Sequence, residues 1–430
     1  MKNAALGLQH LLAMYAGAIL VPLIVGDALG LTTEQLTYLV AIDILMCGVA
    51  TILQVLQNRF FGIGLPVVLG CTFTAVGPMI AIGAEYGITA IYGAILVSGL
   101  FVFLVGRFFG KLVRFFPPVV TGSVVTIIGI TLIPVAINNM GGGEGASDFG
   151  SVVNIALSFG TLLFIIFMYR FTKGFIKSIS ILLGLIAGTI VAAVMGMVKF
   201  QAVTDASYLH LPHPFYFGTP TFEWSAIVTM ILVAIVSLVE STGVYFALGD
   251  ITERKLTEKD LGNGYRAEGL AIILGGIFNA FPYTAFSQNV GLIQMTGVKK
   301  KRIIMITGAM LITLGFIPKI AAVTTIIPTP VLGGAMIAMF GMVISQGIKM
   351  LGPVIKESSE NAMIIACSVG MGLGVTVVPE IFAKLPNSIQ ILTSNGIVAG
   401  SVTAILLNML FHMLPHKKSS SSVVLKEQEI

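Results

Sequence analysis

The feature that most limits how this chain can fold is a series of long runs without a polar side. Residues 11–25 and 181–198 are apolar at nearly every position, so no face of a helix there suits water. Strands that cross a membrane would instead alternate apolar and polar residues. Only 10% of the chain is charged, against about 25% in soluble domains. The sequence therefore predicts an all-α polytopic membrane protein.

Apolar segments of membrane-crossing length recur along the whole chain. A crossing needs about 20 residues, so a chain of 430 residues has room for about 14 crossings joined by short loops. The first segment is kept as a crossing because no small-residue cleavage pattern follows it. The predicted spans are 5–25, 36–56, 64–83, 88–106, 115–137, 151–169, 178–198, 226–249, 261–280, 284–297, 303–318, 322–345, 361–378 and 395–414.

Basic residues are concentrated in alternate loops between these segments. With the N-terminus in the cytoplasm, 20 of the 24 Lys and Arg residues fall in cytoplasmic loops or tails. The opposite loops hold Lys199, Lys319 and Lys384, and Arg266 lies at the cytoplasmic entrance of a span. Because cytoplasmic loops carry the excess of positive charge, we expect both termini in the cytoplasm.

A short motif appears once in each half of the chain. Residues 118–123, Pro-Val-Val-Thr-Gly-Ser, resemble residues 330–335, Pro-Val-Leu-Gly-Gly-Ala, and Gly129 matches Gly341 at the same offset of 212 residues. That offset is close to half of the chain. With seven spans in each half, the second copy enters the membrane from the opposite side. The pattern predicts two inverted seven-span repeats, an arrangement found in secondary transporters.

Two segments are poorly suited to a continuous helix. Glycine, proline and β-branched residues interrupt residues 62–78 in the first half and residues 281–291 in the second. Irregular backbone at membrane depth is tolerated where it lines a cavity, and paired broken spans point to a binding site. We therefore expect short β-strands near 71–74 and 285–288, in spans 3 and 10, facing each other.

Four ionisable side chains inside predicted spans are functional candidates, since a charge is costly there unless it is paired or hydrated. Glu240 lies beside Ser and Thr residues that leave room for a ligand, and a carboxyl group capped for helix packing is the alternative. Glu268 is either a coupling group or a helix-end ion pair with Arg266 or His10. His10 bonds either a carboxylate or a backbone carbonyl, and Asp43 is equally open.

Side-chain amides and aromatic rings mark the broken segments. Gln288 and Asn289 each offer a donor and an acceptor without a charge. An amide pair with one carboxylate suits a planar heterocycle that alternates N–H and C=O groups. Phe73, Phe286 and Tyr283 are candidates to stack on such a ring, although packing is the commoner role of an aromatic side chain.

Several other classes of function have no support in the sequence. The chain has no GxxxxGK[ST] phosphate loop and no HExxH motif, so neither an ATP-driven pump nor a zinc enzyme is expected. The net charge is +5, but the basic residues are dispersed, so no nucleic-acid partner is expected. Cys47, Cys71 and Cys367 share no close spacing, which favours packing roles and no metal site. Residues 416–430 are predicted to be a disordered cytoplasmic tail.

One stretch resembles a known family signature. Residues 287–297, Ser-Gln-Asn-Val-Gly-Leu-Ile-Gln-Met-Thr-Gly, match the pattern QNxGxxxxTG of the nucleobase/ascorbate transporter family. Gln9-His10, Glu240 and Glu268 also resemble the family's pattern, so the resemblance covers nearly the whole chain. The Gln-Asn pair is similar to the xanthine and uric acid branch, whereas uracil carriers tend to have Glu in place of the Gln.

The resemblance implies a domain division. Residues 1–110 (spans 1–4) and 224–320 (spans 8–11) would form a core domain, and residues 111–200 (spans 5–7) and 321–415 (spans 12–14) a gate domain. It also implies a homodimer in the bacterial cell membrane, with the lipid bilayer as the other partner.

The resemblance further implies roles for individual residues. Glu240 and Gln288 would bind a purine, and Phe73 with the backbone of Ser287 would line the pocket. The supporting positions are Asn289, Thr72, Gly291 and Thr296, and the proton-coupling positions are Glu268, His10 and Glu240. Thr72 stands where related xanthine carriers often have Asn, and Glu268 where Asp is common, which affects the predicted specificity.

The predicted function is proton-driven import of xanthine, with no cofactor and no enzymatic activity, by an elevator-like movement of the core against the gate. Uric acid, guanine or another purine is the alternative substrate, and sodium the alternative coupling ion. A uracil carrier or an anion exchanger of the same architecture is less favoured. An anion exchanger would present a positive site, and the charges near the broken segments are acidic.

Overall fold

The computed structural model describes residues 2–112, 116–209, 211–386, 390, 393 and 395–414. The predicted tail at 416–430 lies outside these residues. The first half contains α1 (Lys2–Ala28), α2 (Thr33–Val55), β1 (Leu69–Cys71), η1 (Phe73–Ala75), α3 (Val76–Tyr86), α4 (Ile88–Leu112), α5 (Pro118–Thr131), α6 (Ile133–Gly141), α7 (Val152–Phe171), α8 (Gly174–Ser178), α9 (Ser180–Val194) and α10 (Gln201–Asp205).

The second half continues with a similar order of elements. It contains α11 (Trp224–Ile251), α12 (Glu258–Phe278), β2 (Tyr283–Ala285), α13 (Ser287–Thr296), α14 (Lys301–Gly315), α15 (Pro318–Thr325), α16 (Thr329–Val354), α17 (Ser359–Val377), η3 (Pro379–Phe382), α19 (Gly396–Asn408) and η4 (Met409–Met413). In each half two long helices precede a short strand, and a helix follows that strand directly or after one 3-10 turn.

Nine helices of the described part of the chain are long and apolar enough to cross a membrane. A tenth crossing is obtained if α14 and α15, which bend by 81°, form one span. Helix α9 is only 15 residues long, and α12 begins with Glu258, Lys259 and Asp260. The predicted spans 3 and 10 are broken by strands. These findings establish a multi-pass membrane protein, and length alone does not give the predicted count of 14.

The two strands form one antiparallel pair, in which Leu69 lies opposite Ala285 and Cys71 opposite Tyr283. Their bounds correct the sequence prediction, which started each strand about two residues late. Thr72 ends the first strand because its hydroxyl accepts the Thr74 N–H at 3.3 Å and so starts η1. Threonine favours such local caps over extended backbone when the following turn is helical.

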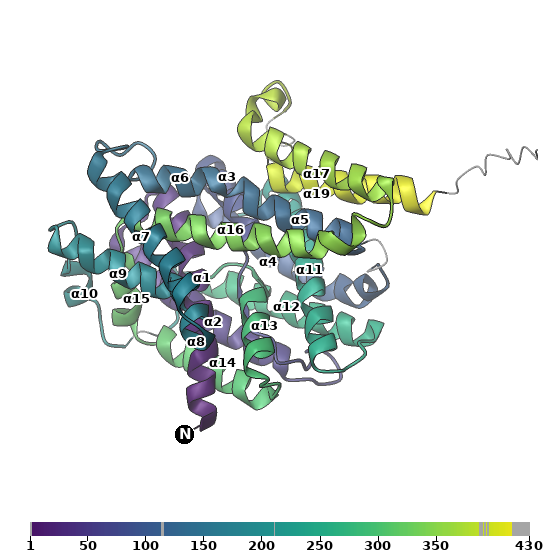
Figure 1. Cartoon of the computed structure of the whole chain (residues 1–430), viewed down its shortest axis with the longest axis horizontal. Helices are drawn as coiled ribbons and strands as arrows, with labels where there is room; N and C mark the ends of the chain where they lie inside the picture. The colour runs from purple at the N-terminus through teal and green to yellow at the C-terminus, as the bar shows by residue number, and fades with distance from the viewer. Residues whose placement is uncertain are drawn as a thin grey trace, which may run out of the picture.

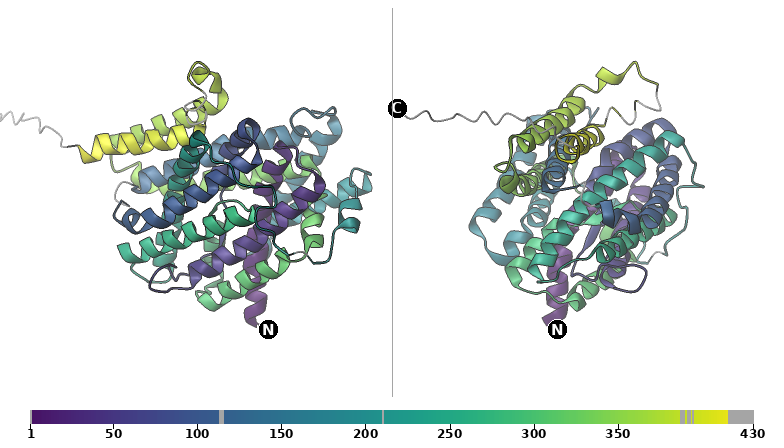
Figure 2. Two further views of the ribbon diagram at one scale, coloured as in Figure 1. Left: turned by 180° about the vertical axis from the view of Figure 1, so that it is seen from behind. Right: turned by 90° about the vertical axis from the view of Figure 1, so that its right-hand side faces the viewer.

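The helices pack in two groups. In the first, α4 lies along α12, α2 lies along α14, α1 contacts both α2 and α14, and α11 packs on α4. In the second, α16 packs on α5, α6, α7 and α9, while α17 and α19 pack on each other and on α5. Figure 1 shows α17 and α19 as a pair beside α5 and α16. In the side view of Figure 2, the same pair lies at the edge of the molecule.

The two helices that carry the repeated motif pack against each other. A Cβ added at Gly129 of α5 would lie 2.9 Å from the Phe340 carbonyl oxygen, and one at Gly347 of α16 would lie 2.6 Å from the Thr126 nitrogen. Small residues let helix backbones approach closely in a membrane protein. The glycines of α5 and α16 therefore permit the central contact of the second group.

Candidate functional site

A cavity of about 260 Å³ lies between the two groups of helices. One wall comes from η1, α11 and α13 of the first group, and the other from α5 and α16 of the second. Pockets for drug-sized ligands measure about 300–1,000 Å³, so this cavity suits a smaller molecule. The side chains used below are Phe73, Glu240, Phe286, Ser287, Gln288, Gly291, Gln294, Gln346 and Lys349.

Glu240 lies in the middle of α11 and faces this cavity. Its Oε2 atom is buried and has no hydrogen-bond partner within the described residues. The side chains of Thr74 and Thr284, one from each broken segment, face its carboxyl group. A buried polar atom without a partner is costly. Glu240 is therefore poised to bond a ligand, which the simple packing alternative does not explain.

The N-terminus of α13 forms the polar wall next to Glu240. Ser287 and Gln288 occupy its first turn and line the cavity. The preceding residue, Phe286, provides no side-chain cap, so the backbone N–H groups of this turn are free to act as donors. A Cβ added at Gly291, one turn further on, would meet no atom within 4 Å. Gly291 therefore leaves open space in the cavity.

Two of the three candidate aromatic residues line the cavity. Phe73 is 6% exposed and makes an edge contact with Phe340, with ring centroids 5.7 Å apart. Phe286 is 3% exposed and lies against Gly70, where a Cβ would approach its ring to 2.5 Å. Tyr283 is fully buried in β2 away from the cavity, so it is not placed to stack on a ligand.

Asn289 points away from the cavity toward α1. Its Nδ2 donates to the His10 carbonyl oxygen at 3.0 Å and lies 3.2 Å from His10 Nδ1. His10 is 2% exposed. The His10 ring contacts the Asn289 amide. Among the described residues it bonds neither a carboxylate nor a backbone carbonyl, the two partners expected from the sequence.

Glu268 is fully buried in α12 and accepts a hydrogen bond from the Tyr245 hydroxyl of α11. Gln54 of α2 donates in turn to the same hydroxyl. Neither of the partners expected from the sequence pairs with Glu268. Arg266 lies over the Phe103 ring at 4.8 Å, and His10 bonds Asn289. The helix-end ion pair proposed for Glu268 is therefore wrong.

Hydroxyl groups connect the surroundings of the two glutamates. Thr284 faces Glu240, and its hydroxyl lies 3.0 Å from the Ser241 hydroxyl. Ser241 in turn faces the Glu268 carboxyl and accepts the Ala285 N–H at 3.1 Å. Both hydroxyls can donate and accept. The two carboxyl groups are thus connected by the hydroxyl groups of Thr284 and Ser241.

Two residues predicted to support the site do not reach the cavity. Thr72 is fully buried, and its hydroxyl lies 3.2 Å from that of Ser237 on α11. Thr296 donates to the Leu292 carbonyl at 2.8 Å in the last turn of α13, which ends at Gly297 with a φ of 67°. Glycine is the residue that most easily adopts that conformation. The Thr-Gly end of the signature therefore terminates the helix.

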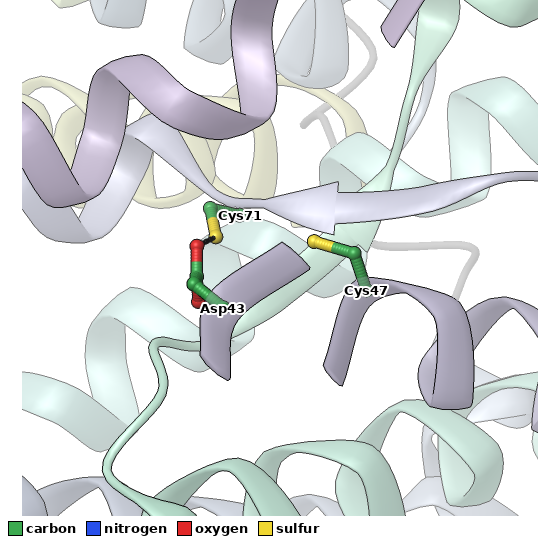
Figure 3. Close-up of side chains that lie close together, drawn as sticks. All are labelled: Asp43, Cys47 and Cys71. Carbon is green, nitrogen blue, oxygen red and sulfur yellow. Dashed lines mark hydrogen bonds between the residues drawn. The ribbon is translucent and has the colours of Figure 1, made fainter. Parts of the chain in front are cut away.

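Asp43 and Cys47, one turn apart on α2, come together with Cys71 of β1 (Figure 3). Their potential ligand atoms all lie within 4.8 Å of one another, and all three residues are buried. Asp43 already accepts the Phe281 N–H at 3.0 Å and a bond from the Cys71 thiol. A structural zinc site needs four ligands, and this group offers three. One of the three, Asp43, already bonds both broken segments through Phe281 and Cys71. We assign it a structural role.

Two residues of α16 that line the cavity are absent from the site predicted from the sequence. Gln346 and Lys349 of α16 line the same cavity as Glu240. Lys349 had been assigned to a cytoplasmic loop, and the charges near the broken segments had been described as acidic only. Both expectations are wrong. Helix α16 continues to Val354, so Lys349 lies on a helix and lines the cavity.

Membrane-length helices that enclose a polar cavity between two packed groups define the class of multi-pass membrane transport proteins. The family model Xan_ur_permease, described as Permease family, matches residues 1–381. The chain therefore belongs to this family, the nucleobase/ascorbate transporter family.

Curated relatives agree with this assignment. The chain is 66% identical to "Xanthine permease" of Bacillus subtilis (strain 168), over 100% of this chain and 98% of that protein. It is also 66% identical to "Uric acid permease PucK" of the same organism, over 94% of both chains. A third relative, "Xanthine permease XanP" of Escherichia coli (strain K12), is 32% identical over 94% of this chain and 90% of its own.

Solved structures share the fold at low sequence identity. The transmembrane domain of the cyanobacterial bicarbonate transporter BicA has a TM-score of 0.63 and 18% identity, covering 90% of this chain and 98% of that domain. Murine Solute Carrier 26 family member A9, an anion transporter in the inward-facing state, has a TM-score of 0.61 and 10% identity, covering 95% and 68%. The fold is thus a transporter fold shared with anion carriers.

Proposed function

We propose that this protein imports xanthine by proton symport and that uric acid or guanine is the alternative substrate. The observation that carries the proposal is the Glu240 carboxyl group, whose buried Oε2 atom has no partner among the described residues, in one small cavity with the Gln288 amide. Both a xanthine permease and a uric acid permease are 66% identical to the chain. Purine nucleobase transport is common to both names, and the choice of xanthine follows the relative with the fuller coverage.

The cavity offers what a purine dione requires. The Glu240 carboxyl group is positioned to accept from a ring N–H, and the Gln288 amide to bond a neighbouring N–H and C=O pair. The free N–H groups at the start of α13 provide further donors for a ring oxygen. Phe73 and Phe286 supply apolar faces on which the planar ring can stack. Asn289 supports this wall by holding α13 to α1.

Proton coupling fits the pair of buried glutamates. Burial in an apolar environment favours the neutral form of a carboxyl group, so a proton can enter with the substrate. In this scheme Glu240 accepts the proton beside the substrate, and Thr284 with Ser241 connects it to Glu268. His10 influences the site through Asn289. The coupling ion is the proton in this proposal, with sodium as the alternative.

We also propose the full architecture implied by the family resemblance. The broken segments β1–α3 and β2–α13, together with α9, α12 and α14, complete 14 crossings in two inverted repeats. The first group of helices corresponds to the core at 1–110 and 224–320, and the second to the gate at 111–200 and 321–415. The core would slide against the gate in an elevator movement within a homodimer. Both termini would lie in the cytoplasm of a bacterium.

The decisive experiment is uptake of labelled xanthine by cells that lack their own purine carriers. Wild-type protein should accumulate xanthine, a protonophore should abolish accumulation, and unlabelled xanthine should compete better than uric acid, guanine, hypoxanthine or uracil. Glu240→Gln should abolish proton-driven accumulation, because the residue can no longer exchange a proton. If protein present in the membrane takes up no purine, the proposal fails, and bicarbonate exchange becomes the function to test.

A further inference from the structure

The cavity that Glu240 faces is also lined by polar side chains that the proposed purine contacts do not use. Gln294 lies six residues after Gln288 on α13, and Gln346 and Lys349 lie on α16. Residues three apart lie on the same face of a helix, so the last two side chains project together. The three residues Gln294, Gln346 and Lys349 therefore line one cavity from both groups of helices.

None of these three side chains has a hydrogen bond or an ion pair with another described residue. Two other basic residues of the described chain form ion pairs. Arg254 bonds Asp260 at 2.5 Å, and Lys299 bonds Glu253 at 3.1 Å. The ammonium group of Lys349 is thus available to a ligand rather than used to neutralise a carboxylate.

We propose that Gln294, Gln346 and Lys349 form a second binding subsite that takes an oxopurine in its anionic, deprotonated form. The inference rests on the proposed purine transport and adds a charge preference to it. An ammonium group and two amide N–H donors match a ring anion whose charge is spread over carbonyl oxygens. Glu240 lines the same cavity and disfavours an anion when it is ionised, so the cavity holds one group of each sign, Glu240 and Lys349.

Purines differ in their charge at neutral pH, which is the property that this subsite would distinguish. Uric acid is largely an anion at neutral pH because its charge is delocalised over the ring carbonyls, whereas hypoxanthine is neutral. A subsite with one fixed positive charge should hold uric acid on its way through the cavity and ignore hypoxanthine. Attraction between charges in a partly hydrated cavity is also screened by salt.

The test is equilibrium binding of labelled uric acid and hypoxanthine to the purified full-length protein, without a proton gradient. Lys349→Gln should weaken uric acid binding about tenfold, the effect of losing one charge-assisted hydrogen bond, and leave hypoxanthine binding unchanged. Lys349→Arg should retain uric acid binding. Lys356→Gln is the matched control, because this lysine follows α16 and does not line the cavity. Added salt should weaken only uric acid binding, and only when residue 349 is basic.

Equal loss of uric acid and hypoxanthine binding in Lys349→Gln would overturn the inference, as would the same loss in Lys356→Gln. If Lys349→Gln does not fold, salt titration of the wild-type protein decides: equal salt sensitivity for both purines contradicts a charged subsite. A wild-type protein that binds no purine would instead contradict the proposed function itself. The two failures are therefore distinguishable.

Discussion

The two broken segments occupy matching places in the two halves of the chain, yet they contribute differently to the cavity. The first, β1 with η1, is buried throughout and offers one ring, Phe73. The second, β2 with α13, offers the Phe286 ring and, in addition, a hydroxyl, an amide and an open glycine, namely Ser287, Gln288 and Gly291. The paired strands supply one shared frame. Each segment thus brings one aromatic ring to the cavity, and only the second adds the polar groups proposed to bond the substrate.

The largest loss of purine affinity should follow from removing the Gln288 amide of the second segment. Gln288→Ala leaves polar atoms of the bound purine without partners, at about 1–3 kcal/mol each, so two lost bonds weaken binding about 100-fold or more. The melting temperature should stay unchanged, because Gln288 bonds no other described residue. Xanthine binding and a thermal melt of the purified protein measure both effects. A purine affinity equal to that of the wild type would show that the second segment does not recognise the ring.

Adding one methyl group should lower the melting temperature when it is placed in the first segment and leave it unchanged when it is placed in the second. Gly70→Ala places a Cβ 2.5 Å from the buried Phe286 ring, and such overpacking costs about 1–3 kcal/mol, so the melting temperature should fall. Gly291→Ala meets no atom within 4 Å, so stability should be retained while the cavity becomes smaller. Thermal melts with and without xanthine compare the two variants. A destabilised Gly291→Ala protein would contradict the described difference between the segments.

The contribution of the first segment to binding should be moderate. Phe73→Leu keeps an apolar side chain but removes the ring face, which is worth about 0.5–1.5 kcal/mol beyond area burial. Xanthine affinity should fall about three- to tenfold, while Phe73→Tyr should retain most of it. Binding measurements on both variants test this order. If Leu and Phe serve equally well, stacking on Phe73 has no role.

The smallest effect is expected at Thr72. Thr72→Val removes the hydroxyl that lies 3.2 Å from that of Ser237, and one such hydrogen bond contributes about 0.5–1.5 kcal/mol to stability. Purine affinity should change little, since Thr72 does not line the cavity. Denaturation and binding assays, with Thr72→Ser as the control that keeps the hydroxyl, separate these effects. A changed order of purine preference would assign Thr72 to specificity instead.

Local sequence signals located the recognition residues, because glycine, proline and amides interrupt an otherwise apolar pattern around Gln288. Contacts between distant segments were not visible in the same way. Tyr245 reaches Glu268 because α11 and α12 both pack against β2. Asp43 meets Cys71 because β1 passes over α2. Lys349 looked like a loop residue because hydropathy ends a span where the first charge appears, even when the helix continues.

The strand pair is only three residues long on each side, and the side chains that face the substrate begin directly after it. Its backbone bonds and the Asp43 contact to Phe281 do not involve Phe73, Ser287 or Gln288. The cavity-lining residues Phe73, Ser287 and Gln288 can therefore change without disturbing the β1–β2 strand pair. Such separation makes the site readily evolvable, so that relatives such as the xanthine and uric acid permeases of one bacterium, each 66% identical to this chain, can differ in their cargo.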